Sequence, residues 1–216
     1  SFMNTSKIES DGINPIREDL AKVDRITDAK SFVSTIGELE ISGGPGIFGS
    51  YIYPDVGNST QYAIYIYQGG LSLPDEAYYR EDQYQPIREA FLEHVKKMSQ
   101  LSGIIIDGQS LLKLETQIAS FHWDQVKDRD ALLTYNKKSY SELKQLSNNF
   151  DWDGYLAAGQ IPATKFQEIV VREPSFFEGL SKLLEEFDLP AWQNWLRWQI
   201  LSGAAAYLNE ALVNQN

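Results

Sequence analysis

The stretch Leu71-Ser72-Leu73-Pro74-Asp75-Glu76-Ala77-Tyr78-Tyr79-Arg80 lies between two kinds of sequence and is the best guide to the fold. Before it, residues 48–53 and 61–68 are rich in Tyr and Ile, and turn-forming residues 54–58 separate them, which predicts a β-hairpin. After it, from Tyr84, apolar residues recur at three- and four-residue steps, which predicts a helix ending before Gly103. Because two strands alone are marginally stable, we expect the hairpin to lie against helices or to recruit another strand.

Helix-start signals recur along the rest of the chain. The Ser139-Tyr140-Ser141-Glu142 segment is a capping box, in which serine and glutamate satisfy each other's backbone N–H groups. The expected helices begin at Asn14, Asp28, Tyr84, Ser110, Ser139, Asp151, Pro174 and Asp188. A β-branched run at residues 167–172 predicts a short strand. The pattern predicts a mainly α fold: a multi-helix lobe with a small β-hairpin or short sheet.

Residues 190–213 predict a single long helix with apolar residues on almost its whole circumference. These residues are Trp192, Trp195, Leu196, Trp198, Ile200, Leu201, Tyr207, Leu208, Leu212 and Val213. The pattern is typical of a helix buried on several sides. We therefore interpret the tryptophans as core rather than as a sugar-binding platform. Since one apolar face is expected to lack a partner within the chain, we expect either self-association through the 190–213 helix or binding of hydrophobic dyes to it.

The composition indicates which binding partners and which cellular location to expect. With 30 acidic and 19 basic residues the net charge is -11, which repels phosphate backbones and anionic membranes. We expect no nucleic acid and no membrane as a partner. The chain has no cysteine, so it can form neither a disulfide framework nor a cysteine metal site, and a cytoplasmic location fits best. No apolar run approaches the roughly 20 residues that span a bilayer.

The sequence offers no constellation for catalysis or metal binding. A zinc peptidase of the His-Glu-x-x-His type needs two histidines one helical turn apart. The two histidines here, His94 and His122, are far apart in sequence, and Met98 and Val126 stand four residues after them. The glycine-rich residues 43–46 are interpreted as a turn rather than a phosphate-binding loop. We therefore assign no catalytic, cofactor-binding or metal-binding residue to this chain.

Several motifs in a fixed order resemble the N-terminal segment of neprilysin-type zinc metallopeptidases, the family that includes endothelin-converting enzymes and bacterial oligoendopeptidase O. The family's Gly-Leu-Pro-x-x-x-Tyr-Tyr block is similar to residues 70–79, which follow the predicted strand pair. A long helix follows at residues 87–98, and Leu114-Glu115-Thr116-Gln117-Ile118-Ala119 matches a Leu-Glu-x-x-Ile/Leu-Ala segment. Further similar stretches are Leu133-Thr134-Tyr135-Asn136-Lys137 and the aromatic helix at residues 195–208.

This resemblance implies a function for the protein of which the chain would be a part. It implies that residues 14–216 are the N-terminal helical domain of a bacterial zinc metalloendopeptidase that hydrolyses oligopeptides, and that they form the lobe that caps and size-restricts the active-site cavity. Residues 1–13 would be a flexible N-terminus or a vector-derived remnant. Zinc and the catalytic motifs would belong to a C-terminal catalytic domain absent from this sequence, so the chain alone is expected to be inactive.

A second class of function stays open on the residues alone. Aromatic residues make up 12% of the chain, which also suits a stand-alone helical protein- or carbohydrate-binding module. A His-Glu-x-x-His motif downstream in the reading frame would favour the peptidase, and a stop codon after Asn216 would favour the module.

Overall fold

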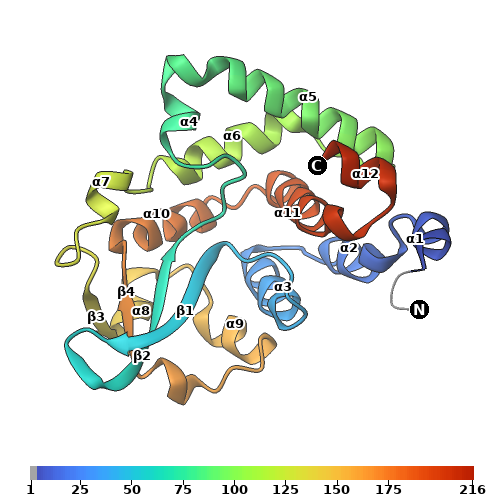
Figure 1. Cartoon of the computed structure of the whole chain (residues 1–216). Coiled ribbons are helices and arrows are strands. Elements are labelled where there is room, and N and C mark those ends of the chain that lie inside the picture. The colour runs from blue at the N-terminus through green and yellow to red at the C-terminus, as the bar shows by residue number, and fades with distance from the viewer. Residues whose placement is uncertain (1–3) are drawn as a thin grey trace.

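The computed structural model of the chain describes residues 4–216 (Figure 1). It begins with α1 (Thr5–Asp11), the 3-10 turn η1 (Asn14–Ile16), α2 (Arg17–Val23) and α3 (Ala29–Ile41). The Asn4 side chain caps α1 by accepting a hydrogen bond from the Lys7 backbone N–H, and the flexibility expected for residues 1–13 stays a prediction. Residues 1–3 of this expected flexible terminus or vector-derived remnant lie outside the described part of the chain.

The predicted hairpin is confirmed as β1 (Phe48–Asp55) and β2 (Asn58–Gln68), which pair antiparallel. Two short strands, β3 (Asn136–Ser139) and β4 (Glu168–Val171), complete a four-stranded sheet with the order β1-β2-β4-β3. The strand β4 was predicted, and it pairs parallel with β2, so that Ile64 lies opposite Ile169. Pairing with β4 thus gives the hairpin the further strand that its stability requires.

The helices after the hairpin begin close to where the sequence places them. They are α4 (Ala77–Arg80), η2 (Asp82–Tyr84), α5 (Gln85–Ser102), α6 (Gly108–Ala119) and α7 (Gln125–Asp128). Gly103 ends α5 in a left-handed conformation with φ 73°, as predicted. The helix α6 begins before Ser110, because the Asp107 side chain accepts hydrogen bonds from the backbone N–H groups of Gln109 and Ser110. It ends at Ala119, before the expected residue 123.

The next helices lie against the sheet and against α3. They are α8 (Tyr140–Leu146), α9 (Trp152–Ala158), η3 (Ala163–Phe166) and α10 (Pro174–Glu185). The capping box at Ser139 and the cap at Asp151 are both present. The helices α3 and α9 pack closely, since a Cβ atom at Gly37 would lie 2.5 Å from the Tyr155 carbonyl oxygen.

The structure corrects the prediction of one helix over residues 190–213. It contains α11 (Leu189–Ala204), the 3-10 turn η4 (Ala205–Tyr207) and α12 (Glu210–Gln215). The break arises because Leu208 is extended and because the Asn209 side chain accepts a hydrogen bond from the Leu212 N–H at 3.2 Å, which starts a new helix. The new helix turns back to pack on α5 (Figure 1).

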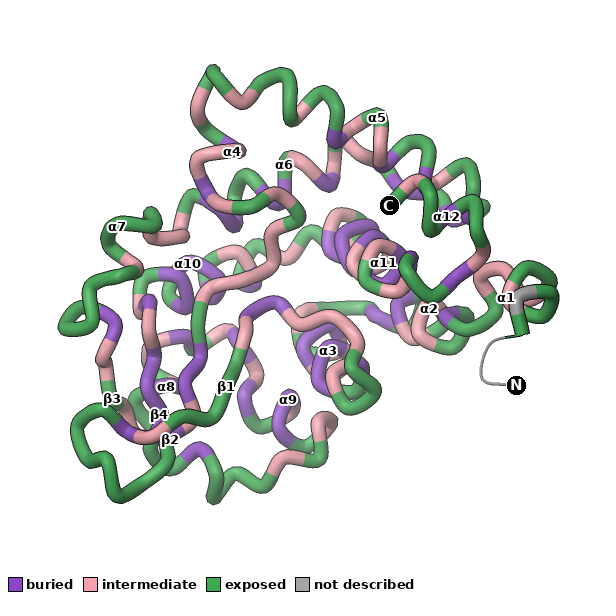
Figure 2. Tube along the Cα trace, in the orientation of Figure 1, coloured by how far each residue is buried: buried purple, intermediate pink, exposed green. Residues whose placement is uncertain are grey.

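The prediction that residues 190–213 leave one apolar face uncovered is also wrong. Eight of the ten apolar residues named above are buried, and only Tyr207, at 81%, and Val213, at 42%, are exposed. The helix α11 runs through the interior and packs against α2 and α6, as the buried positions in Figure 2 show. The exposed apolar surface on which self-association was expected to depend therefore consists of only these two side chains. Self-association itself stays a prediction.

One main hydrophobic core joins the helices to one face of the sheet. Phe48 of β1 contacts Trp152, with ring centroids 5.5 Å apart, and Phe177, at 5.6 Å. The opposite face of the sheet carries a small separate cluster of Ala63, Tyr65 and Val170, with Tyr135 beside it. Among the described residues, no helix is both long enough and apolar enough to span a membrane. The fold class predicted from the sequence, a mainly α lobe with a small sheet, is confirmed.

Candidate functional site

A groove of about 750 Å³ opens where the ends of the hairpin meet α2 and α11. Its walls are the start of β1, the end of β2, the loop at residues 42–46 and the C-terminal turns of α11 and η4. Asp19 is the one charged side chain among the described lining residues, and Lys22 pairs with it at 2.9 Å. The groove therefore presents mainly backbone and small side chains, which suits an extended chain better than a compact charged ligand.

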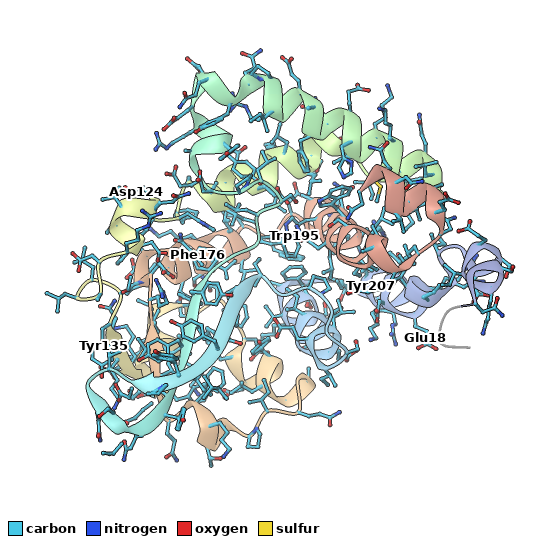
Figure 3. All side chains as sticks on the ribbon, in the orientation of Figure 1. Glu18, Asp124, Tyr135, Phe176, Trp195 and Tyr207 are labelled. Atoms are coloured by element: carbon cyan, nitrogen blue, oxygen red, sulfur yellow. The ribbon has the colours of Figure 1, made fainter. Side chains whose placement is uncertain are left out.

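Glycines shape two walls of this groove. Gly70 has φ 82°, a conformation that favours glycine, and it turns the chain out of β2. A Cβ atom at Gly49 would overlap the ring of Tyr67, so the absence of a side chain lets that ring lie over β1. Figure 3 shows Trp195 inside the molecule. Its Nε1 donates a hydrogen bond to the Gly70 carbonyl at 3.2 Å, which holds the turn at Gly70 against α11.

A buried glutamate lies directly behind the groove. Glu115 of α6 is fully buried, and its Oε1 accepts hydrogen bonds from Ser72 Oγ at 2.7 Å and from Gln199 Nε2 at 3.1 Å. Its Oε2 accepts from the Ser72 backbone N–H at 3.1 Å and from the Tyr79 hydroxyl at 2.6 Å. Trp198 Nε1 donates to Ser72 Oγ at 2.8 Å. These five residues, the Glu115 network, hold the segment after β2 against α6 and α11.

The protonation of this network follows from its burial. Burial raises the pKa of Glu115 to about 7, and the hydrogen bonds from Ser72 and Tyr79 oppose that rise. The pKa of Tyr79 is raised, first by burial and then by the adjacent carboxylate, so Tyr79 stays a hydrogen-bond donor. No described cation pairs with Glu115, and neutral donors alone stabilise its charge. The arrangement suits a structural clamp, because the donors to this one carboxylate come from separate segments of the chain.

In the sequence, Ser72, Tyr79 and Glu115 stand out only within separate motifs, and no local pattern predicts that their side chains meet. The signal was present in α6: Glu115 lies on the same helical face as the buried Leu111 and Ile118, four residues after one and three before the other. A carboxylate on an apolar face must find hydrogen-bond donors. What the sequence could not reveal was that two distant segments supply them.

A second polar cluster fixes the other side of the segment after β2. Glu173 is fully buried and accepts a hydrogen bond from the Gln68 backbone N–H at 2.8 Å. Burial, followed by the neighbouring Asp128, raises the pKa of Glu173 to about 8. Arg172 binds both carboxylates, at 3.2 Å and 3.0 Å. The cluster anchors the ends of β2 and β4 to α7.

The two histidines have separate structural roles. His122 Nε2 lies 2.9 Å from the Gly69 carbonyl, and burial lowers the pKa of His122 to about 4, so the ring is neutral and donates this hydrogen bond. His94 Nδ1 lies 3.1 Å from Gln215 Nε2, and its ring meets Trp198 edge-on. Within residues 4–216, no group of three His, Cys, Asp or Glu side chains could hold a metal ion. The expectation that this chain carries no catalytic, cofactor-binding or metal-binding residue stays a prediction.

The tryptophans of α11 belong to the core, as their pattern in the sequence predicts. Trp192, Trp195 and Trp198 are each at most 2% exposed, and Phe32 packs against Trp192 with centroids 4.8 Å apart. They leave no flat exposed ring on which a sugar could stack.

Comparison with known proteins finds relatives that agree on one peptidase family. The N-terminal model of peptidase family M13 matches residues 1–216. Endothelin-converting enzyme 1 from Cavia porcellus is 26% identical over 172 residues, 76% of this chain and 23% of that protein. The same enzyme from Bos taurus is 25% identical over 223 residues, 96% of this chain and 30% of that protein. The chain thus spans less than a third of these curated relatives.

Solved structures agree in fold. The crystal structure of the Mycobacterium tuberculosis zinc metalloprotease Zmp1 in complex with an inhibitor superposes with a TM-score of 0.93 and 31% identity, over 100% of this chain and 34% of that chain. PepO from Lactobacillus rhamnosis superposes with a TM-score of 0.77 at 18% identity, over 97% of this chain and 34% of that one, which shows the fold alone. The resemblance to neprilysin-type metallopeptidases is confirmed. Since the family model covers every residue, the chain belongs to peptidase family M13, of which it carries the N-terminal region.

Proposed function

We propose that this chain is the non-catalytic N-terminal part of a zinc metalloendopeptidase that hydrolyses oligopeptides, and that it caps and size-restricts the cavity in which hydrolysis occurs. The observation that carries the proposal is the convergence of three separate family-like motifs on Glu115, directly behind an open groove. The clamp fixes the groove wall, and a fixed concave wall is what size selection requires.

Zinc in the full-length protein would come from outside the residues described here. The histidines of this chain do not fit it: His122 Nε2 is bonded to a backbone carbonyl, and His94 lies on another element beside Gln215. When bound elsewhere in the protein, zinc would supply Lewis-acid activation of water. The residues of this chain would bind and orient the peptide and exclude bulk water from the cavity.

The shape of the groove supports oligopeptides as the substrate class. A volume of about 750 Å³ lies within the range of small-ligand pockets and accommodates a short extended segment, but not a folded domain. Its walls at residues 43–46 and 69–70 are rich in glycine and therefore carry few side chains that would obstruct an extended peptide. A bacterial origin and a cytoplasmic location are part of the same proposal, the latter supported by the cysteine-free sequence.

Narrowing the groove in the full-length protein tests size selection. Gly203 lines the groove, and a Cβ atom there would meet no atom within 4 Å, so Gly203→Trp adds bulk without a clash in the core. We expect kcat/KM to fall at least tenfold for peptides of about 15 residues and less than threefold for peptides of about five. Leu132→Trp, at a side chain that is 90% exposed and is not part of the groove lining, is the matched control. An equal loss for both lengths would contradict the size-restricting role.

The alternative, a stand-alone helical protein- or carbohydrate-binding module, has weaker support. Its carbohydrate form relied on the aromatic content, and the α11 tryptophans are buried. A glycan array probed with this chain tests it directly, and saturable glycan binding would favour the module.

A further inference from the structure

The strand β1 forms one open edge of the sheet. The strand order β1-β2-β4-β3 gives it a neighbour on one side only, and Figure 1 shows no strand beside it on the other. Pro54 stands near its C-terminal end and has no N–H, which is how natural edges are commonly terminated. The part of the β1 edge that can pair with another strand therefore lies before Pro54.

Two hydrogen bonds determine which backbone groups of β1 point outward. The Arg172 N–H donates to the Ile66 carbonyl at 3.0 Å, and the Gln68 N–H donates to Glu173 at 2.8 Å, so even-numbered residues of β2 face β4. Odd-numbered residues of β2 must then face β1, because successive residues of a strand alternate. In the β1–β2 register Ser50 lies opposite Ile66 and Ile52 opposite Ile64. The backbone N–H and C=O groups of Ser50 and Ile52 therefore point away from the sheet.

The two residues that carry these four backbone groups are exposed. Ser50 is exposed, and Ile52 is 70% exposed. Apart from the pairing of β1 with β2, no residue in the 4–216 range hydrogen-bonds to the backbone of either residue. Such unpaired groups in extended geometry match the backbone of another extended chain and bind it by strand addition.

Aromatic side chains lie next to this edge and connect it to the groove. Tyr51 stacks on Tyr65, with centroids 5.0 Å apart and planes at 5°, and Tyr53 meets Tyr65 edge-on. Tyr67 follows on the same face and lines the groove beside Gly49. The Tyr51 hydroxyl accepts a hydrogen bond from Arg172 at 3.1 Å, which holds its ring in place. A chain paired with β1 would pass from this tyrosine face into the groove.

We propose that the edge at Ser50 and Ile52 binds an extended peptide of positive net charge by β-strand addition. The net charge of -11 attracts a cationic peptide and disfavours a second copy of the chain, whose like charge opposes pairing of two β1 edges. Calling this peptide a substrate rests on the proposed function, but its binding to the edge does not.

Fluorescence anisotropy of the 216-residue chain with a labelled heptapeptide of alternating lysine and valine tests the proposal. The variant Ser50→Pro removes one outward N–H at an edge that already tolerates a proline, and we expect it to weaken binding at least tenfold. Ile52→Pro is a second, independent variant with the same expected loss. Tyr62→Ser, at a side chain 75% exposed on the same hairpin but within β2, is the matched control and should change binding less than twofold. Circular dichroism confirms that each variant is folded.

Two further peptides separate strand addition from simple charge attraction. The same heptapeptide methylated on every backbone nitrogen cannot donate to the edge and should bind at least tenfold more weakly. The glutamate–valine analogue should also bind at least tenfold more weakly, and 0.5 M salt should reduce the difference. Binding that survives N-methylation or both proline substitutions overturns the proposal, as does the absence of saturable binding. Concentration-dependent dimerisation abolished by Ser50→Pro would instead assign the edge to a second copy and also overturn it.

The proposed function fails on a different result. If the full-length protein contains no zinc and cleaves no peptide, the peptidase proposal is wrong whatever the edge binds. If the full-length protein cleaves peptides while this chain does not bind the heptapeptide, only the proposal of peptide binding at the β1 edge is wrong.

Discussion

The Tyr79 hydroxyl donates a 2.6 Å hydrogen bond to Glu115, and so joins the segment after the hairpin to a helix 36 residues further along the chain. The same hydroxyl accepts hydrogen bonds from the backbone N–H groups of Ser72, at 3.1 Å, and Leu73, at 2.9 Å. One phenol thus orders the Leu71–Arg80 stretch internally and also ties it to α6. The second tyrosine of the family-like block has a physical role in this contact.

Removing the carboxylate of the Glu115 network should destabilise the chain. We expect Glu115→Ala to lower the free energy of unfolding by about 3 kcal/mol, because the hydroxyl of Tyr79 and two groups of Ser72 lose their acceptor in a buried site. Glu115→Gln keeps an oxygen acceptor and should cost about 1 kcal/mol. Urea denaturation measures both, and Glu93→Ala on an exposed face of α5 is the control, expected within about 0.5 kcal/mol of the parent. Equal effects of Glu115→Ala and Glu93→Ala would show that the network carries no stability.

Stability should depend on the titration of Glu115. Its pKa is raised from 4.5 to about 7, so the folded chain binds the proton more tightly than the unfolded chain. The resulting stabilisation is fully present below pH 4.5 and is lost as the pH rises through about 7. Its full size is about 3 kcal/mol. Glu173, with a pKa raised to about 8, acts in the same direction, whereas His122, with a pKa lowered to about 4, loses stability as the pH falls below 6.5.

The difference between the parent and Glu115→Gln isolates this one group, since both chains keep Glu173 and His122. We expect the unfolding free energy of the parent relative to Glu115→Gln to fall between pH 5 and pH 8, as measured by urea titrations at fixed ionic strength. A flat difference, or one that rises with pH, would contradict the raised pKa of Glu115.

The close approach of α3 and α9 leaves no room for a side chain at Gly37. Gly37→Ala should destabilise the chain by about 2 kcal/mol, because the new Cβ would lie 2.5 Å from a carbonyl oxygen of the α9 backbone, which cannot rotate away as a side chain could. Gly203→Ala makes the same chemical change in the last turn of α11, in open space, and should stabilise by up to about 1 kcal/mol. Thermal unfolding followed by circular dichroism compares the two, and the same sign for both would refute this account of the helix contact.

Burial, rather than apolar character alone, determines how residues 190–213 respond to substitution. Leu212 is fully buried where α12 packs on α5, and its neighbour Val213 is 42% exposed. Leu212→Lys should cost about 3 kcal/mol by burying a charge or detaching α12, whereas Val213→Lys should stay within about 0.5 kcal/mol of the parent. Amide hydrogen exchange in α12, together with urea denaturation, measures both. A harmless Leu212→Lys would mean that α12 is not docked in solution.

Local chemistry explains which parts of the fold could be predicted from sequence. The capped starts at Asp28, Ser139 and Asp151, the stop at Gly103 and the hairpin each depend on residues within a few positions of one another. Their signals are therefore complete in a short window. The strand β4 was also predictable, since its β-branched run suits a buried strand.

The features that the sequence did not reveal depend on distant partners. The strand β3 consists of Asn136-Lys137-Lys138-Ser139, which has no intrinsic strand preference and is extended because it pairs with β4. The break at Leu208 and Asn209 was hidden by a continuous apolar pattern, because that pattern reports burial and not direction. The Glu115 network joins residues 43 and 84 positions apart, which no local window contains.

Zinc content and peptide turnover, measured side by side on this 216-residue chain and on the full-length protein, test the central claim most directly. Both samples would be dialysed against metal-free buffer, analysed for zinc by mass spectrometry and assayed with a quenched fluorescent peptide library with and without a chelator. We expect the full-length protein to keep about one zinc ion per chain and to cleave peptides in a chelator-sensitive way, and the isolated chain to fold, bind no zinc tightly and cleave nothing. Tight stoichiometric zinc and chelator-sensitive cleavage by the pure isolated chain would contradict the account.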